Sequence, residues 1–267
     1  LSIRRQRQMC IRDRYEGYLL HKGGKGLAWN TVSTYMRMLQ AVYNRAVARK
    51  LAAFIPHQFR DVFTGRKADH RRVLERDDMQ KLLVEREPDI TSPGMAWARA
   101  CLELMFRFHG MPFVDLAHLR KSDLKDGYLT LRRRKTGMPL SARVDGRAMQ
   151  LLERYRNRDD TSPYLLCFLD GNLEGMAAYR DYQRILRLLN SRLRALALWK
   201  KVQGKVTSYS ARHTWATVGR YCHIPIEVIS EGLGHASVTT TEGYMKGFGN
   251  SRMDRANKVI MNYIFKG

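Results

Sequence analysis

Acidic residues, cysteines and long hydrophobic runs are all scarce in this chain. Its 267 residues include 25 Asp and Glu against 48 Lys and Arg, which gives a formal net charge of +23. The longest apolar run, residues 164–169, is far shorter than the ~20 residues that a membrane-spanning helix needs. No secretory signal pattern occurs either. We therefore expect a protein that neither spans a membrane nor is secreted.

The four cysteines are spread along the chain. Cys101, Cys167 and Cys222 lie far apart, Cys10 belongs to a basic N-terminal stretch, and no Cys-x-x-Cys pair occurs. This pattern predicts neither a disulfide framework nor a zinc site. A reducing cytoplasm is the setting that we expect for such cysteines.

The excess of Lys and Arg over Asp and Glu indicates a polyanionic partner. Neutralising phosphates with Lys and Arg releases counterions, and this release dominates nucleic-acid affinity. Nucleic acid is therefore the leading partner, ahead of a membrane surface. A purely RNA-binding module is disfavoured because the sequence has no aromatic-rich motif for stacking single-stranded bases. The length, with 44% hydrophobic residues, favours two domains with ordinary cores.

Residues 4–13 carry a separate signal. Their sequence is RRQRQMCIRD, the in-frame translation of a widely used sequencing-library adapter. We therefore interpret residues 1–14 as an adapter-derived artefact and leave them out of fold reasoning. A genuine basic arm is the alternative. Without the five arginines and one aspartate of residues 4–14, the formal net charge falls only from +23 to +19.

Residues 15–63 have a helical pattern. Apolar side chains recur there at three- and four-residue steps, which predicts a buried stripe. Arg37 and Arg45 lie beside this stripe, where we expect them to reach DNA phosphates; a solvated basic face is the alternative. Residues 64–74 are polar, basic and without periodicity, which indicates a linker. The predicted stripe consists of Val32, Tyr35, Met36, Leu39, Val42, Tyr43 and Ala46.

The most informative pattern lies near the C-terminus. It consists of three linked pieces: SYSARHTWAT at 208–217, LGH at 233–235 and TTEGY at 240–244. Together they resemble the C-terminal signature of the tyrosine recombinase (phage integrase) family. An arginine, a histidine and a tyrosine match the family in type, order and spacing. These residues are Arg212, His235 and Tyr244.

The resemblance implies a specific chemistry. In the family, a tyrosine hydroxyl attacks a DNA phosphodiester and keeps the bond energy in a 3′-phosphotyrosine, so neither a metal nor a nucleotide cofactor is needed. Tyr244 would be the nucleophile, Arg212 would hold non-bridging oxygens, and His235 would donate a further hydrogen bond. Tyr209 replaces a histidine usual in the family, and we interpret it as a positioning donor; a half-buried aromatic is the alternative. Tyr263, a rival nucleophile, lacks the preceding Thr-Thr pair.

A β-hairpin is predicted around Lys-Thr-Gly at 135–137, because strand-like stretches flank this turn. In the family, a lysine at the hairpin tip protonates the departing 5′-oxygen, which implies this role for Lys135. A simple phosphate contact is the alternative. Arg132 and Arg134 share a face if the strand alternates, and we expect them to contact the DNA backbone.

One catalytic arginine of the family is missing. The family usually has Gly-x-Arg-x-x-Glu-Leu where this chain has GMPFVDL at 110–116. Pro112 stands at the arginine position and carries neither a charge nor an N–H. Arg107 and Arg133 are possible substitutes, and Asp115 matches the acidic residue that orients the site. A similar loss occurs in integrases of conjugative and mobilisable elements, which resemble this run.

The resemblance also implies the architecture. We expect a mainly α fold with a small antiparallel β-sheet. A truncated helical core-binding (SAM-like) domain would occupy residues 15–63, and a mixed α/β catalytic domain of tyrosine recombinase type would occupy 75–267. Residues 253–265 predict a weakly amphipathic helix, which in the family often docks on a neighbouring subunit.

Three functions remain open. The first is a site-specific integrase that cuts and rejoins double-stranded DNA to integrate or excise a mobile element. It would act as a tetramer on DNA, with accessory DNA-bending proteins. The second is a catalytically impaired, DNA-binding accessory protein on the same scaffold, and the third is a relaxing topoisomerase. Cleavage separates the second from the others, and recombination between two sites separates the first from the third.

Overall fold

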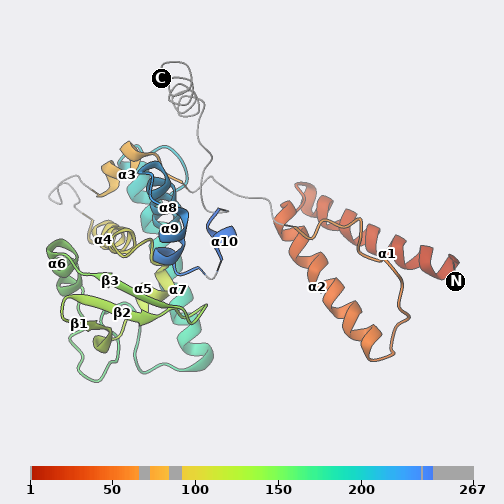
Figure 1. The fold of residues 1–267 in the computed structure, drawn as a ribbon, viewed down its shortest axis with the longest axis horizontal. Helices are drawn as coiled ribbons and strands as arrows, with labels where there is room; N and C mark the ends of the chain where they lie inside the picture. The colour runs from red at the N-terminus through yellow and green to blue at the C-terminus, as the bar shows by residue number, and fades with distance from the viewer. Residues whose placement is uncertain (1, 66–72, 84–91, 236, 243–267) are drawn as a thin grey trace, which may run out of the picture. The chain divides into compact units, whose positions relative to one another are not determined.

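The computed structural model describes residues 2–65, 73–83, 92–235 and 237–242. The chain divides into two compact units, Leu1–Asp69 and His70–Gly267 (Figure 1). The expected mainly α fold with a small antiparallel sheet is confirmed. Across the described ranges, no helix is both long enough and apolar enough to cross a bilayer.

The first unit consists of two helices and a short core between them. Helix α1 (Ser2–His21) is joined through the 3-10 turn η1 (Lys22–Gly24) to α2 (Trp29–Ala48) (Figure 1). Leu19 of α1 is buried against Val32 and Met36 of α2 and against Val62. Helix α1 runs through the residues interpreted as adapter-derived, and the origin of those residues stays a prediction.

The stripe predicted for α2 is only partly buried. Val32 and Met36 are fully buried, but Tyr35 is 43% exposed and Val42 is 66% exposed, so the prediction was wrong for these two. Leu39, Tyr43 and Ala46 are half-buried. Within the described unit, α1 and the segment that follows α2 cover one narrow side of the helix. The helical period identifies which side of α2 is buried, but it does not show how many residues on that side the neighbouring segments cover.

The second unit is built around α4 (Pro93–Arg107). Every residue from 98 to 105 is buried, because α4 has neighbours on several sides, and a helix apolar around most of its surface is typical of a core. Buried Glu103 accepts hydrogen bonds from Arg107 and from Arg147. The helices around α4 are α3 (Arg76–Leu83), α5 (Phe113–Ala117), α6 (Gly146–Arg154), α7 (Gly175–Trp199) and α8 (Ser210–Tyr221).

The sheet of this unit is antiparallel, in the order β1-β2-β3. Its strands are β1 (Leu124–Lys125), which follows η3 (Lys121–Asp123), β2 (Tyr128–Arg132) and β3 (Pro139–Arg143). The predicted hairpin is confirmed: β2 and β3 pair with Leu131 opposite Leu140 and Arg132 opposite Pro139.

Two short helices complete the described fold. Helix α9 (Ile226–Leu233) lies beside α8, and α10 (Val238–Glu242) lies beside α9 (Figure 1). Ala216 of α8 and Ile229 and Leu233 of α9 form a small buried cluster. This packing brings the C-terminal end of α9 to the first turn of α8.

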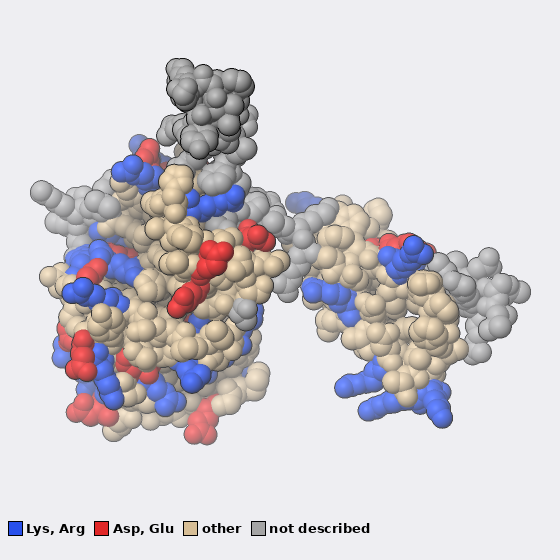
Figure 2. All heavy atoms as spheres, viewed as in Figure 1, with Lys and Arg blue, Asp and Glu red and all other residues tan. Residues whose placement is uncertain are grey.

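The basic side chains are widely distributed. Figure 2 shows Lys and Arg on the visible face of both units, with Asp and Glu interspersed among them on the second unit. The positive charge on this face is therefore not confined to a single patch.

Candidate active site

Arg212 lies in the first turn of α8 and is only 2% exposed. Hydrogen bonds fix the chain just before this turn. The Ser208 N–H donates to Oδ1 of Asn190 on α7 over 2.8 Å, and the Thr207 N–H donates to Oγ of Ser210 over 3.0 Å. The start of α8, and with it Arg212, is thus tied to α7.

The Arg212 guanidinium joins three segments that are distant in the sequence. Its Nη1 donates to the Gly110 carbonyl over 3.0 Å, and its Nη2 donates to the Leu233 carbonyl over 2.6 Å. Nη2 also lies 2.8 Å from Nε2 of His235. Two of the three predicted catalytic residues near the C-terminus are therefore in direct contact.

Gly110 approaches Arg212 more closely than any other residue type can. A Cβ on Gly110 would lie 2.9 Å from Cα of Arg212, and φ at this position is +67°. Only glycine adopts a left-handed backbone without steric cost. This close approach allows the Gly110 carbonyl to reach the guanidinium.

Arg133 lies in the same cluster and is 6% exposed. Its Nε donates to Oδ2 of Asp115 over 3.2 Å, and its Nη1 donates to the carbonyls of Leu233 and Gly234. The Leu233 carbonyl thus accepts hydrogen bonds from both Arg133 and Arg212. Two guanidiniums converge there from the hairpin and from α8.

Asp115 holds the base of the hairpin. Besides Arg133, its carboxylate accepts the Arg134 backbone N–H at Oδ1 over 3.0 Å. Asp115 is buried within α5, and it orients the Arg133 side chain and the backbone of Arg134. This contact agrees with the orienting role predicted for it, although its contribution to a reaction stays a prediction.

The C-terminal end of α9 provides the acceptors for both arginines. Gly234 adopts φ +62° and ends the helix, which leaves the last carbonyls without helical partners. These carbonyls form the negative end of the helix dipole and favour nearby cations. A Cβ on Gly234 would lie 2.6 Å from Cδ of Arg133, so glycine at this position also makes room for the arginine.

Arg107, the other possible substitute, lies outside this cluster. It pairs with Glu103 on its own helix and with Asp145, at 2.9 and 2.6 Å. Pro112, at the position of the missing arginine, precedes α5, and its carbonyl accepts the N–H groups of Asp115 and Leu116. Of the two candidates, only Arg133 contacts the acceptors of Arg212.

The contacts of His235 define its tautomer. The Arg212 guanidinium has only donors, so Nε2 of His235 is the acceptor and the ring proton is on Nδ1. Nδ1 lies 2.7 Å from Oγ1 of Thr241, which is fully buried. Burial and the guanidiniums of Arg212 and Arg133 lower the pKa of His235 from 6.5 to about 4. The imidazole is therefore neutral near neutral pH.

Acidification is expected to destabilise the second unit through His235. Because its pKa falls from 6.5 to about 4 on folding, the unfolded chain binds more protons between these two values. The stabilising contribution of neutral His235 is therefore fully present above the unfolded pKa and is lost as the pH falls toward the folded one. Unfolding midpoints measured across this window should fall more steeply for the wild type than for His235→Gln. Equal slopes for the two proteins would contradict this prediction.

The other predicted site residues lie on the surface or outside the described ranges. Lys135 at the hairpin tip is exposed, and so are Arg132, Arg134 and Arg45. Tyr209 directly precedes α8, is 43% exposed and has its ring 6.3 Å from that of His213. Arg37 is half-buried on α2, and its Nη2 lies 3.3 Å from Oγ1 of Thr34. Tyr244 and Tyr263 lie outside the described residues.

Several functional groups could not be recognised in the sequence. The acceptors for the arginines are the carbonyls of Gly110, Leu233 and Gly234, and every residue has a carbonyl. The two glycines were the available signal, since each permits a close approach. Thr241 belongs to the predicted Thr-Thr pair, but only the structure identifies its hydroxyl as the partner of His235.

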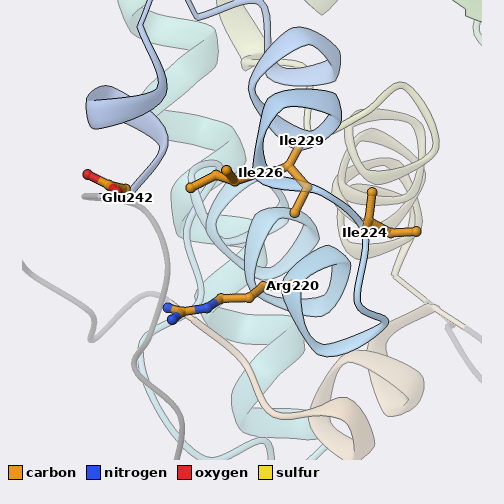
Figure 3. A pocket seen from close by; sticks show the side chains of 5 residues that line it. All are labelled: Arg220, Ile224, Ile226, Ile229 and Glu242. Carbon is orange, nitrogen blue, oxygen red and sulfur yellow. The ribbon is translucent and has the colours of Figure 1, made fainter.

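A separate pocket of about 390 Å³ lies between α8, α9 and α10 (Figure 3). It contains none of the predicted catalytic residues. Ile224, Ile226 and Ile229 give it an apolar lining, and Arg220 and Glu242 complete it. The cluster around Arg212 is thus a site distinct from this hollow. Within the described ranges, no group of three His, Cys, Asp or Glu side chains is arranged to hold a metal ion.

Comparisons with known proteins agree on one family. The model of the phage integrase family matches residues 72–249. Tyrosine recombinase XerA of Pyrococcus furiosus is 29% identical over 140 residues, which cover 51% of this chain and 46% of XerA. The chain therefore matches less than half of the XerA length. The putative integrase/recombinase y4gC of Sinorhizobium fredii is 27% identical over 180 residues, which cover 65% of this chain and 88% of y4gC.

A solved structure has the same fold. The crystal structure of a lambda integrase(75-356) dimer bound to a COC' core site superposes with a TM-score of 0.63 at 19% identity. The match covers 92% of this chain and 81% of the lambda integrase chain.

Proposed function

This chain belongs to the phage integrase family, and from this premise we propose that it cuts and rejoins double-stranded DNA through a 3′-phosphotyrosine. The observation that carries the proposal is the convergence of Arg133 and Arg212 on the Leu233 carbonyl. Two buried guanidiniums side by side repel each other, and a phosphodiester anion is a ligand that both can hold by charge-assisted hydrogen bonds.

In the proposed reaction, the Tyr244 oxygen forms a bond to the scissile phosphorus and gives its proton to water, while the bond between phosphorus and the 5′-oxygen breaks. Arg212 and Arg133 stabilise the charge that develops on the non-bridging oxygens. Lys135 gives a proton to the departing 5′-oxygen. Once the phosphate has displaced the contact with Arg212, His235 donates to it from Nε2 in its other neutral tautomer, while the Thr241 hydroxyl donates to Nδ1. Tyr209 helps to position the phosphate. No metal or nucleotide takes part, because the phosphotyrosine conserves the bond energy.

We infer that Arg133 takes the role of the arginine missing at Pro112. Support comes from its burial, from the carboxylate of Asp115 that orients its Nε, and from the carbonyl that it shares with Arg212. Arg107 is instead bound to Glu103 and Asp145. The active site would thus receive its second phosphate clamp from the hairpin rather than from the start of α5.

The wider biological role is also a proposal. Integration or excision of a mobile element, a tetramer on DNA and accessory DNA-bending proteins would follow from the family chemistry. The lambda integrase crystal structure contains a dimer bound to a core site, which supports DNA and a second copy of this chain as partners. Arg37, Arg45, Arg132 and Arg134 would contact the DNA backbone.

The test uses nicked duplexes made from the DNA that flanks the gene, designed so that cleavage releases a short strand and traps the enzyme on the DNA. We expect a covalent adduct of this chain with DNA that resists denaturation. Binding without an adduct would overturn the enzyme proposal and favour the accessory protein, which the proline at 112 makes the second candidate. An adduct with plasmid relaxation but no exchange between two sites would favour a topoisomerase.

A further inference from the structure

The turn between α4 and α5 contains two consecutive left-handed residues. His109 has φ +56° and Gly110 has φ +67°. The second is a glycine, but the first is a histidine, and a side chain in this conformation is strained. The left-handed backbone alone does not mark a functional site, because exposed His223 adopts it as well.

The contact that holds His109 is an aromatic one. Its half-buried imidazole lies against Trp215, with ring centroids 5.6 Å apart and planes tilted by 43°. Trp215 follows Arg212 by three residues on α8, so both side chains lie on the same side of that helix. Within the described part of the chain, the structure records no hydrogen bond to the His109 ring. Packing against Trp215 is therefore the contact that holds the His109 ring.

Trp215 also packs against the residue that precedes the other acceptor of Arg212. A Cβ on Gly232 would lie 2.8 Å from the Trp215 ring, so the indole lies directly against the backbone of α9. Gly232 immediately precedes Leu233, whose carbonyl accepts from Arg212 and Arg133. The pair of rings therefore links the backbone that presents the Gly110 carbonyl to the backbone that presents the Leu233 carbonyl.

From this geometry we infer that His109 and Trp215 are positioning residues for the phosphate clamp. Together they fix the distance between the two carbonyls that orient the Arg212 guanidinium. The role rests on the proposed function, because it concerns how Arg212 meets the phosphate. A cavity of about 390 Å³ lies beside the two rings, bordered by Leu140, Val228 and Glu231. Because the cavity leaves this side of the two rings uncovered, the rings are held in place by their contact with each other and by the α9 backbone.

The test measures single-turnover cleavage of the nicked duplex at saturating enzyme. His109→Gly keeps the turn and removes the ring, and Trp215→Leu removes the other ring. Each is expected to cleave about tenfold more slowly, because small displacements of a catalytic group are costly. The double variant should be no slower than either single variant, since both break the same contact. Trp215→Phe, which keeps an aromatic ring, should retain most of the rate.

A second substrate separates positioning from general damage to the fold. When a methyl group replaces one non-bridging oxygen of the scissile phosphate, the neutral methylphosphonate needs less help from Arg212. His109→Gly is expected to slow cleavage of this substrate by less than about threefold. A variant that acts by unfolding the protein would slow both substrates equally.

His223→Gly is the matched control. His223 is also left-handed, with φ +60°, but it is exposed after the end of α8. This variant is expected to cleave both substrates like the wild type. Wild-type rates in His109→Gly and Trp215→Leu, or equal losses on the two substrates, would overturn the inference alone. Absence of any adduct in the wild type would overturn the proposed function and this inference with it.

Discussion

Replacing Tyr244 with phenylalanine is expected to abolish the covalent adduct while leaving DNA binding intact. Phenylalanine keeps the ring but has no oxygen to carry the phosphoryl group, so the first step of covalent catalysis cannot occur. Removing a nucleophile reduces the rate by more than removing any single stabilising donor. The measurement is the fraction of nicked duplex that becomes attached to protein, compared with binding of the same duplex in a gel-shift assay.

Tyr263→Phe provides the matched control. It removes the same hydroxyl from the other tyrosine of the C-terminal region, which lacks the Thr-Thr pair and the nine-residue spacing from His235. We expect this variant to form the adduct at the wild-type level. Loss of the adduct in Tyr263→Phe with its retention in Tyr244→Phe would identify Tyr263 as the nucleophile. Such a result would show that the spacing in the signature had been misinterpreted.

The C-terminal signature grouped two residues that the fold brings into contact. Arg212 and His235 are 23 residues apart in the sequence and 2.8 Å apart in the fold. This contact was predictable because the short helices α8 and α9 lie between these residues, and local packing brings the ends of such a pair together. When the residues of a motif lie on helices that are consecutive in the sequence, their spacing therefore predicts most of their arrangement in space.

The choice between Arg107 and Arg133 depended on contacts across the fold. Arg133 meets Asp115 18 residues away and Leu233 100 residues away, and no local pattern encodes such distances. One signal was available: strand alternation puts Arg133 on the same face as buried Leu129, and opposite Arg132 and Arg134. A buried arginine in an exposed run is unusual, but the sequence could not tell what it was buried against.

The α2 stripe illustrates a different limit. Its helical period correctly identified Val32 and Met36 as core, but Tyr35 and Val42 are exposed. Periodicity gives the direction of an apolar face, whereas the width of the buried strip depends on the neighbours that cover it. In the first unit, within the described residues, that cover consists of α1 and the segment after α2.

Arg133→Ala is expected to reduce the cleavage rate by about 100- to 1000-fold, the effect typical of losing one donor that stabilises a developing oxyanion. DNA affinity should change much less, because many other basic residues contact the backbone. Arg133→Lys should recover only part of the rate, since an ammonium cannot hold Asp115, the α9 carbonyls and a phosphate oxygen in one planar arrangement. The measurement is single-turnover cleavage at saturating enzyme.

Stability must be separated from chemistry in this experiment. Removing Arg133 leaves the buried carboxylate of Asp115 without its ion-pair partner, which typically destabilises a protein by about 3–5 kcal/mol. Combining Arg133→Met with Asp115→Asn removes both charges, so the unfolding midpoint should recover. Because the guanidinium is still absent, the cleavage rate should stay low. Recovery of both quantities would mean that Arg133 acts only on folding.

Arg107→Ala is the matched control, because it also removes an arginine from an ion pair with a buried carboxylate. Glu103 keeps Arg147 as a partner, and among the residues that the structure describes no contact of Arg107 reaches the acceptors of Arg212. The variant is therefore expected to unfold at a lower temperature while its cleavage rate stays near that of the wild type. The reverse pattern, in which Arg107→Ala is inactive and Arg133→Ala active, would make Arg107 the substitute. It would also require α4 to rearrange on DNA, since Arg107 is turned toward Asp145 in the free protein.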